Sequence, residues 1–409
     1  MNILIIHQAF ASLEEPGGTR HFEFARLLVT SGHRVTIVAS PVSYLTGRRT
    51  SASGSRPGLD AETDHLRIRR AWVYGEHHRS FGHRVVAFFT FMVSSFWVSM
   101  TAGPVDVVWG TSPPIFQGLT GWLVARLKGA AFLFEVRDLW PQFAIAIGVL
   151  KGWLAIALSE RLERFLYSHA DAVMANSPGF VDHILKRGGR QVRLILNGAD
   201  PSMFDPAADG ADLRKKLGLQ GKFIAMYAGA HGVSNDLNVL LEGAGLLAGS
   251  DVHFVLLGDG KEKPALRARA REMRLSNVTF LDPVPKSEVP AALAMADACI
   301  AILKPLEEYK TTYPNKVFDY MAAGRPVILA IDGVIRSVVE RAGCGIYVPP
   351  GDASALAKAA AGLAEDRHRA AALGLKGRCY LEEHFSRAAA AEELGRLLSD
   401  LTARRRSPA

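Results

Sequence analysis

The strongest constraint on the fold is an alternation that runs through the whole chain. Short runs of branched apolar residues alternate with longer segments of helical periodicity. Strands that are followed by helices in this way build βαβ units, and a series of such units forms a parallel sheet with helices on both faces. The pattern therefore predicts an α/β protein with doubly wound sheets.

The predicted strands fall into two series, which are separated by a loop over 197–212. The first series is 2–7, 34–39, 66–73, 105–109, 131–135, 172–175 and 192–195, with helices over 19–30, 116–127 and 154–167. The second is 223–227, 252–257, 278–281, 299–303, 327–330 and 345–348. We expect two doubly wound domains of similar length, followed by alanine-rich helices over 353–365 and 387–401.

Charge and cysteine content narrow the classes of function. The formal net charge is +8, which attracts any polyanion, but no zinc-finger spacing or aromatic and basic RNA-binding pattern accompanies it, so we expect no nucleic-acid partner. The 3 cysteines form no metal-binding spacing, and we expect neither a metal nor a cofactor. The first residues lack a signal-peptide pattern, which favours the cytoplasm.

One apolar segment bears on membrane association. Residues 85–102 carry no charge, and hydroxyl residues with a following Gly103-Pro104 lower their apolarity. A buried helix, a helix lying on an anionic bilayer surface and a spanning helix remain as alternatives, of which the spanning helix is disfavoured. The Ser- and Arg-rich residues 41–63 predict a mobile surface loop.

Loops that follow parallel strands are the usual ligand sites of such sheets. Gly17 and Gly18 follow the first strand and precede a helix, an arrangement that leaves backbone N–H groups free for an anion, or simply makes a tight turn. The spacing is not GxGxxG, and no acidic residue ends the second strand, which disfavours a dinucleotide site.

Charged residues gather at the end of the strand 131–135. Glu135, Arg137 and Asp138 stand within four positions there. Because buried charges are costly unless they are paired or used, these residues are either a structural pair or catalytic groups that orient a substrate.

The first two loops of the second domain are rich in small residues. Gly229 and Gly232 permit close approach of a phosphate, with His231 between them. Gly258, Asp259 and Gly260 either admit a flat base beside the backbone or form a tight turn.

The segment 310–327 is the most informative. Pro314 suits the first helical position with a threonine cap before it, and Gly324 ends the helix. N–H groups of the first turn together with Lys316 predict a diphosphate clamp, and Asp319 on the same face is suited to sugar hydroxyls. The alternative is an ordinary capped helix with a Lys316–Asp319 ion pair.

Taken together, these motifs resemble glycosyltransferase family 4, in particular its WbuB-like branch. The motifs are the glycine pair at 17–18, GHRV at 32–35, EVRDLWP at 135–141, NGAD at 197–200, YAGAHG at 227–232 and PNKVFDYMAAG at 314–324. The resemblance implies a GT-B fold of two Rossmann-like domains facing across a cleft. Residues 1–200 would bind the acceptor, 201–385 the nucleotide-sugar, and 386–409 would be a helix packing back towards the first domain.

The resemblance also implies roles for individual residues. Asn315 and Lys316 would hold the donor diphosphate, Asp319 the ribose, and Gly258 to Gly260 the base. Arg137 would stand where many members have a histidine near the reacting sugar, beside Asp138, and Gly17 and Gly18 would border the acceptor.

The sequence departs from the family pattern in two places. Family members have two glutamates eight positions apart, where this chain has Thr311 and Asp319. The cationic pair that commonly follows the first strand of the second domain is replaced by Ala230-His231-Gly232.

The family implies a retaining, metal-independent transfer of a sugar from a UDP-sugar to a lipid-linked or oligosaccharide acceptor, at the inner face of the plasma membrane. Two alternatives remain. A catalytically silent sugar-nucleotide-binding partner is favoured by Thr311, and a Rossmann oxidoreductase or epimerase is disfavoured by the missing dinucleotide fingerprint.

Overall fold

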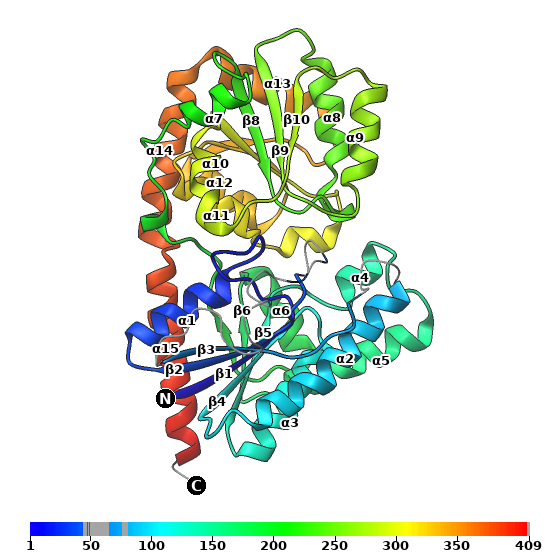
Figure 1. Ribbon diagram of the computed structural model, residues 1–409, viewed down its shortest axis with the longest axis vertical. Helices are drawn as coiled ribbons and strands as arrows, with labels where there is room; N and C mark the ends of the chain where they lie inside the picture. The colour runs from blue at the N-terminus through cyan, green and yellow to red at the C-terminus, as the bar shows by residue number, and fades with distance from the viewer. Residues whose placement is uncertain (44–46, 48, 50–64, 76–80, 407–409) are drawn as a thin grey trace. The chain divides into compact units, whose positions relative to one another are not determined.

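The computed structural model describes residues 1–43, 47, 49, 65–75 and 81–406 (Figure 1). The chain divides into two compact units. Unit 1 comprises Met1–Leu196 and Ala388–Ala409, and unit 2 comprises Asn197–Arg387. Most of the predicted loop 41–63 lies outside the described residues.

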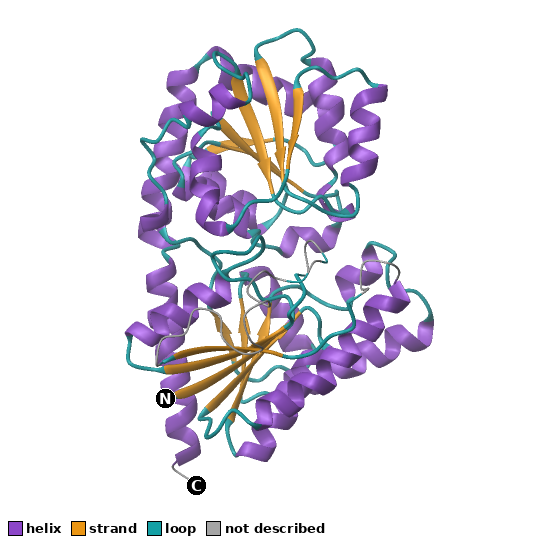
Figure 2. Ribbon diagram, viewed as in Figure 1, coloured by secondary structure: helices purple, strands orange, loops and turns teal. Residues whose placement is uncertain are grey.

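Unit 1 is built on a parallel sheet with helices on both faces (Figure 2). In the described residues the strand order is β3-β2-β1-β4-β5-β6-β7. The strands are β1 (Asn2–His7), β2 (Arg34–Ala39), β3 (Leu66–Arg70), β4 (Val107–Ser112), β5 (Ala131–Val136), β6 (Ala172–Ala175) and β7 (Val192–Leu194). The order reverses between β1 and β4, so their carboxyl ends form the switch point at which such sheets bind ligands.

The helices of unit 1 are divided between the two faces of this sheet. They are α1 (Arg20–Thr30), α2 (Phe81–Met100), α3 (Phe116–Lys128), α4 (Gln142–Ala146), α5 (Trp153–His169), α6 (Val181–Lys186) and α15 (Arg387–Arg406). Helices α1 and α15 share one core with Ile5, Ile37 and Leu133. Side chains alternate along a strand, so Phe134 points to the opposite face, where a Cβ on Gly118 of α3 would lie 2.6 Å from it and 2.9 Å from Leu166 of α5.

Unit 2 is also built on a parallel sheet, and in the described residues its strand order is β10-β9-β8-β11-β12-β13. Its strands are β8 (Phe223–Ala228), β9 (Val252–Leu257), β10 (Val278–Leu281), β11 (Ala298–Ile302), β12 (Val327–Ala330) and β13 (Gly345–Tyr347). Its helices are α7 (Ala211–Lys216), α8 (Leu237–Leu246), α9 (Lys263–Glu272), α10 (Val289–Ala294), α11 (Asn315–Ala322), α12 (Val334–Ala342), α13 (Ala353–Glu365) and α14 (Arg367–His384). The reversal here lies between β8 and β11.

The two parallel-sheet units confirm the predicted fold class. Strand bounds agree within three residues, but the sequence analysis missed the 18-residue helix α14. The inward positions of α14 are small: a Cβ on Gly374 would lie 2.0 Å from the carbonyl oxygen of Gly324, and one on Gly377 would lie 2.9 Å from Cys344. Because no large apolar stripe marks its buried face, periodicity alone did not reveal it.

Candidate functional site

In unit 2 the side chain of Lys316 lies against the loop that follows β8. Its Nζ donates to the Tyr227 hydroxyl at 2.7 Å, lies 4.0 Å from the centre of the Tyr227 ring, and is 3.4 Å from Oδ1 of Asn235. The Tyr227 hydroxyl in turn donates to the carbonyl of Ala230 at 2.7 Å. These contacts hold the cation in the first turn of α11, where backbone N–H groups have no intrahelical partner.

Electrostatics suit this lysine to an anion. Burial lowers the pKa of Lys316 to about 7. A Cβ on Gly229, which has φ +151°, would lie 2.8 Å from Nζ, so a larger residue would displace the ammonium from its place against this loop. The arrangement is a desolvated cation beside the first turn of a helix, which is suited to an anionic group, and its role in holding the donor diphosphate stays a prediction.

The glycines of the β9 loop have a packing role that the sequence analysis did not resolve. A Cβ on Gly258 would lie 1.9 Å from the carbonyl oxygen of Gly229, and one on Gly260 would lie 2.5 Å from that of His231. The space beside these two α-carbons is therefore filled by the neighbouring loop, as in a tight turn, and contact of a base with this loop stays a prediction. Asp259 accepts a hydrogen bond from the N–H of Gly260 at 2.8 Å.

His231 is buried, and its two ring nitrogens have no hydrogen-bond partner among the described residues. Burial, followed by the charges of Lys263 and Lys316, lowers the pKa of His231 to about 4, so the ring is neutral at neutral pH. The imidazole is therefore a buried group beneath the loop that follows β8. Gly232 in the same loop is open, with Asn235 in ordinary contact at 3.6 Å.

Asp319 does not pair with Lys316. Its Oδ2 lies 2.6 Å from Nζ of Lys286, a buried lysine in the short turn Lys286–Glu288 after β10. The intrahelical ion pair considered from the sequence is therefore wrong, because each of the two side chains has a partner outside the helix.

The start of α11 differs in one detail from the helix start predicted from the sequence. Pro314 precedes the helix instead of occupying its first position, and Thr312 donates to the carbonyl of Tyr309 at 3.0 Å rather than capping. Asn315 is the first helical residue, and its buried Oδ1 has no partner among the described residues. A buried carbonyl oxygen without a donor is suited to a ligand N–H or O–H group.

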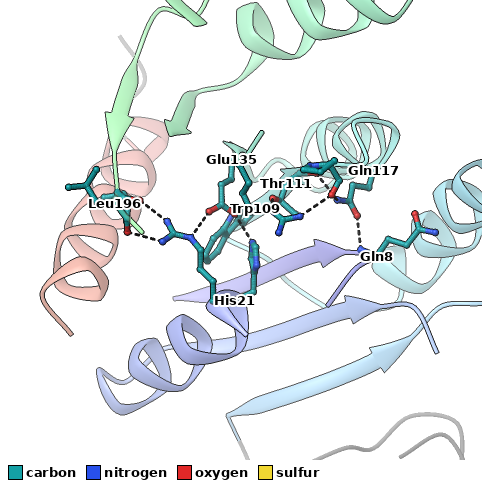
Figure 3. A network of polar contacts seen from close by, with 11 residues as sticks. Gln8, His21, Trp109, Thr111, Gln117, Glu135 and Leu196 are labelled. Atoms are coloured by element: carbon teal, nitrogen blue, oxygen red, sulfur yellow. Dashed lines mark hydrogen bonds and ion pairs between the residues drawn. The ribbon is translucent and has the colours of Figure 1, made fainter. Parts of the chain in front are cut away.

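In unit 1 the fully buried Glu135 is the centre of a polar network (Figure 3). It accepts hydrogen bonds from Arg20 Nε at 2.9 Å, His21 Nε2 at 2.6 Å and Trp109 Nε1 at 3.2 Å. The guanidinium of Arg20 also donates to the carbonyls of Leu196 at 2.8 Å and Ile195 at 2.6 Å. The network ties the start of α1 to β4, β5 and the end of the first chain segment.

Charge balance in this network keeps the carboxylate ionised. Burial alone would raise the pKa of Glu135, but His21 and Arg20 beside it hold that pKa well below its usual range. Burial lowers the pKa of His21, and it lowers that of His7, whose ring centre lies 4.1 Å from that of His21. The structure thus supports the structural alternative for Glu135, although its partners are Arg20 and His21 instead of the neighbouring Arg137.

Arg137 and Asp138 lie at the carboxyl end of β5. Arg137 donates from Nε to Thr111 Oγ1 and from Nη2 to the carbonyl of Pro113, both at 2.9 Å. Burial raises the pKa of Asp138 to about 6, even though Arg137 lowers it. A carboxyl group that titrates near neutral pH is suited to proton transfer.

Gly17 and Gly18 lie just before α1. A Cβ on Gly17 would lie 3.0 Å from that of Ala11, and Gly17 has φ +151°, whereas Gly18 has open space around it. Thr19 donates to Glu23 at 2.5 Å and leaves the first-turn N–H groups of α1 uncapped by a side chain.

Four residues of these two clusters were missed by the sequence analysis: Tyr227, Lys286, Arg20 and His21. Arg20 and His21 follow the glycine pair directly, and two cationic residue types at the start of a helix were the signal available. Tyr227 and Lys286 gave none, since each meets its partner across a long stretch of chain. No group of three or more His, Cys, Asp or Glu side chains in the described part of the chain is placed to hold a metal ion.

Comparison with known proteins places both units in one class. Residues 17–198 match the model of the glycosyl transferase 4-like domain, and residues 222–366 match that of glycosyl transferases group 1. WcaI of Escherichia coli K12, named as a colanic acid biosynthesis glycosyl transferase, is 25% identical over 324 residues, which cover 76% of this chain and 78% of WcaI.

Two solved structures are similar along almost the whole chain. Sucrose-phosphate synthase from Thermosynechococcus elongatus has a TM-score of 0.79 at 20% identity, covering 98% of this chain and 99% of that one. HepE of Anabaena in complex with UDP-glucose has a TM-score of 0.72 at 16% identity, covering 98% and 100%. The fold is therefore GT-B, an architecture of two Rossmann-like units.

With both family models matched in order, the chain belongs to glycosyltransferase family 4 and is a transferase enzyme. Its place in the WbuB-like branch, and the assignment of acceptor binding to residues 1–200, donor binding to 201–385 and a returning helix to 386–409, remain predictions.

Proposed function

We propose that this glycosyltransferase moves a sugar, a hexosamine or deoxyhexosamine, from a UDP-sugar to a lipid-linked or oligosaccharide acceptor in surface polysaccharide biosynthesis. The observation that carries the donor assignment is Lys316, held by Tyr227 against Gly229 in the first turn of α11. Support for the nucleotide comes from HepE, whose structure contains UDP-glucose. Support for the pathway comes from the name of WcaI.

The proposed reaction retains the anomeric configuration and uses no metal. The bond between the anomeric carbon and the diphosphate oxygen breaks, and the developing negative charge is stabilised by Lys316 and the free N–H groups of α11. The acceptor hydroxyl forms the new bond, and its proton passes to a phosphate oxygen or to Asp138. Arg137 assists as a second cation.

Ligand-induced stabilisation tests the donor. UDP, GDP, ADP and NAD are each added with and without EDTA, and the midpoint of thermal unfolding is measured. A ligand at about a hundred times its dissociation constant adds ~2.7 kcal/mol to the native state. Stabilisation by UDP that EDTA does not change is expected, and stabilisation by NAD alone would overturn the proposal.

Turnover tests the role of Lys316. Hydrolysis of the donor by Lys316→Ala should fall by far more than about threefold, because the leaving diphosphate loses its cation. Turnover within threefold of the unsubstituted enzyme would show that Lys316 is not the diphosphate cation.

A silent nucleotide-sugar-binding subunit is the second candidate. It is favoured by Thr311, which stands eight positions before Asp319 where the family has a glutamate, and whose hydroxyl donates to the carbonyl of Glu308 at 2.6 Å. Binding of UDP without hydrolysis or transfer from any UDP-sugar would favour this candidate.

A further inference from the structure

The outer face of α2 is apolar and exposed. Val86, Phe89, Val93 and Trp97 recur at helical spacing and so form one stripe, with Trp97 66% exposed. The opposite stripe, which includes Ala87, Phe91, Ser95 and Ser99, is the buried one. Residues 82–100 are long and apolar enough to cross a membrane by length and composition, yet the buried stripe packs on the sheet of unit 1 and on α3.

A second apolar surface lies at the start of α5. Trp153 is 81% exposed, and Leu154 and Leu158 are also exposed, at 55% and 59%. Solvent-facing apolar side chains at the first two turns of a helix are unusual for a chain that stays in water, because each adds a hydration cost that a polar residue would avoid.

These surfaces belong to one layer. Helices α2 and α3 pack on each other, α3 packs on α5, and all three cover the face of the sheet opposite α1 and α15. Figure 1 shows the three helices running along one side of the sheet of unit 1. Between α2 and α5, helix α3 adds the exposed Leu123 and Leu127.

Charge on the α2 and α3 part of this layer is mainly basic, whereas α5 carries Glu160 and Glu163 beyond its first two turns. Between positions 81 and 134 the sequence has a single acidic residue, Asp106, which accepts a hydrogen bond from the N–H of Asn2. Arg126 and Lys151 are exposed beside the apolar side chains of α3 and α5. Exposed tryptophans among aliphatic and basic side chains match the boundary between the acyl chains and the headgroups of an anionic bilayer.

We propose that the outer layer of unit 1, formed by α2, α3 and the start of α5, docks on an anionic lipid bilayer with Trp97 and Trp153 as its anchors. The inference deepens the proposed function, because a lipid-linked acceptor resides in such a bilayer, and it identifies the surface that meets the lipid. Helix α2 lies in the membrane boundary and does not span it.

Vesicle binding tests the proposal. The full chain, without nucleotide, is sedimented with vesicles of phosphatidylcholine mixed with phosphatidylglycerol and with vesicles of phosphatidylcholine alone. We expect binding to the anionic vesicles that the double variant Trp97→Ser, Trp153→Ser reduces by about tenfold or more. The double variant Arg126→Glu, Lys151→Glu should lose the preference for phosphatidylglycerol.

A matched control uses unit 2. Leu246 and Leu375 are exposed to a similar degree, at 63% and 55%, and Leu246→Ser with Leu375→Ser should leave vesicle binding unchanged. Equal loss in this control, or equal binding by the tryptophan variant, would overturn the proposal. So would a wild-type chain that ignores vesicles and forms dimers that the tryptophan variant abolishes, since a second copy would then cover the layer.

The stabilisation by UDP is measured separately on the same proteins. A chain that binds anionic vesicles through these tryptophans but does not respond to UDP contradicts the proposed donor and supports the docking surface. A chain that UDP stabilises but that binds no vesicle contradicts the proposed docking surface and leaves the proposed donor in place.

Discussion

Burial brings the pKa values of Lys316, in unit 2, and of Asp138, in unit 1, close to neutral pH. The lysine has its pKa lowered to about 7 and the aspartate has its pKa raised to about 6. In both cases desolvation disfavours the charged form. A bound anion would reverse this effect for Lys316, and a carboxyl group such as Asp138, whose pKa is about 6, is suited to accept a proton near neutral pH.

The lysine gives the first prediction, on proton uptake. Bound diphosphate favours the ammonium form, so above pH of about 7 the binding of UDP must draw a proton from solution and the affinity should fall by up to about tenfold per pH unit. Titration calorimetry near pH of about 8 in two buffers of different ionisation enthalpy measures this uptake. Lys316→Met is the control and should show none; identical heats in both buffers for the wild type would contradict the prediction.

The second prediction concerns Asp138→Asn, which should lower kcat by about a hundredfold or more if the carboxylate accepts the proton. The same change should raise Tm at neutral pH. The raised pKa means that the native state loses stability as pH rises through about 6, while below about 4 both states are protonated and the difference vanishes.

Asp182, an exposed carboxylate of the same unit, provides the control. Asp182→Asn should leave kcat unchanged. A loss of activity in Asp138→Asn accompanied by a lower Tm at neutral pH would indicate a structural role instead.

Individual residues differ in how far the sequence predicts them. Lys316 was predicted because helix geometry places it beside the N-terminus of α11 whatever the tertiary contacts are. Asp319 and Lys286 are 33 positions apart, and no local sequence pattern predicts their ion pair. Pairing across the fold depends on where the strands bring distant loops, which periodicity does not specify.

The loops after β8 and β9 behave as one element. Their glycines are required where one backbone approaches the other, and the N–H groups of Gly229 and His231 donate to the carbonyls of Leu257 and Asp259 at 2.9 and 2.8 Å. The glycines of these loops could be identified from the sequence. Their role could not, because glycines are needed both where two backbones approach closely and where a backbone approaches a ligand.

This close approach yields the third prediction. Gly258→Ala would place a Cβ 1.9 Å from the carbonyl oxygen of Gly229, so both loops must move and the free energy of unfolding should fall by more than about 2 kcal/mol. Gly232→Ala in the loop after β8 meets only Asn235 at 3.6 Å and should cost less than about 1 kcal/mol. Urea denaturation compares them; equal stability of the two variants would contradict the packing role.

Among the elements, strands were easier to predict than helices. The central strands of both sheets are buried on two faces and appear in the sequence as apolar runs, as in residues 131–136 and 223–228. Helix α14 buries Ala370, Gly374, Gly377 and Leu381, so its inner face differs little in hydrophobicity from its outer one. Because α14 packs closely through glycines, its sequence lacks the apolar periodicity from which a helix is predicted.

At the scale of the whole molecule, unit 1 is discontinuous in sequence. Leu394, Leu397, Leu398 and Leu401 of α15 belong to the same core as β1 and α1, although the whole of unit 2 separates them along the chain. Removal of a single buried leucine side chain costs about 2 to 5 kcal/mol, and this core contains four from one helix.

Deletion of residues 388–409 is the fourth prediction, and it should unfold unit 1 while leaving unit 2 folded. Limited proteolysis should then digest residues 1–196 and leave a resistant fragment close to 197–387. Deletion of 403–409, beyond the last of these leucines, is the control and should be tolerated. Equal resistance of residues 1–196 in both deletions would show that α15 is dispensable for the core.

The split core also sets an order of events at the ribosome. Every strand and helix of unit 2 has been synthesised before the first turn of α15 that completes unit 1. Domains fold as units as they emerge, so the unit that comes second in the sequence should finish folding first. The first sheet must wait, with part of its apolar face open to chaperones, until α15 leaves the exit tunnel.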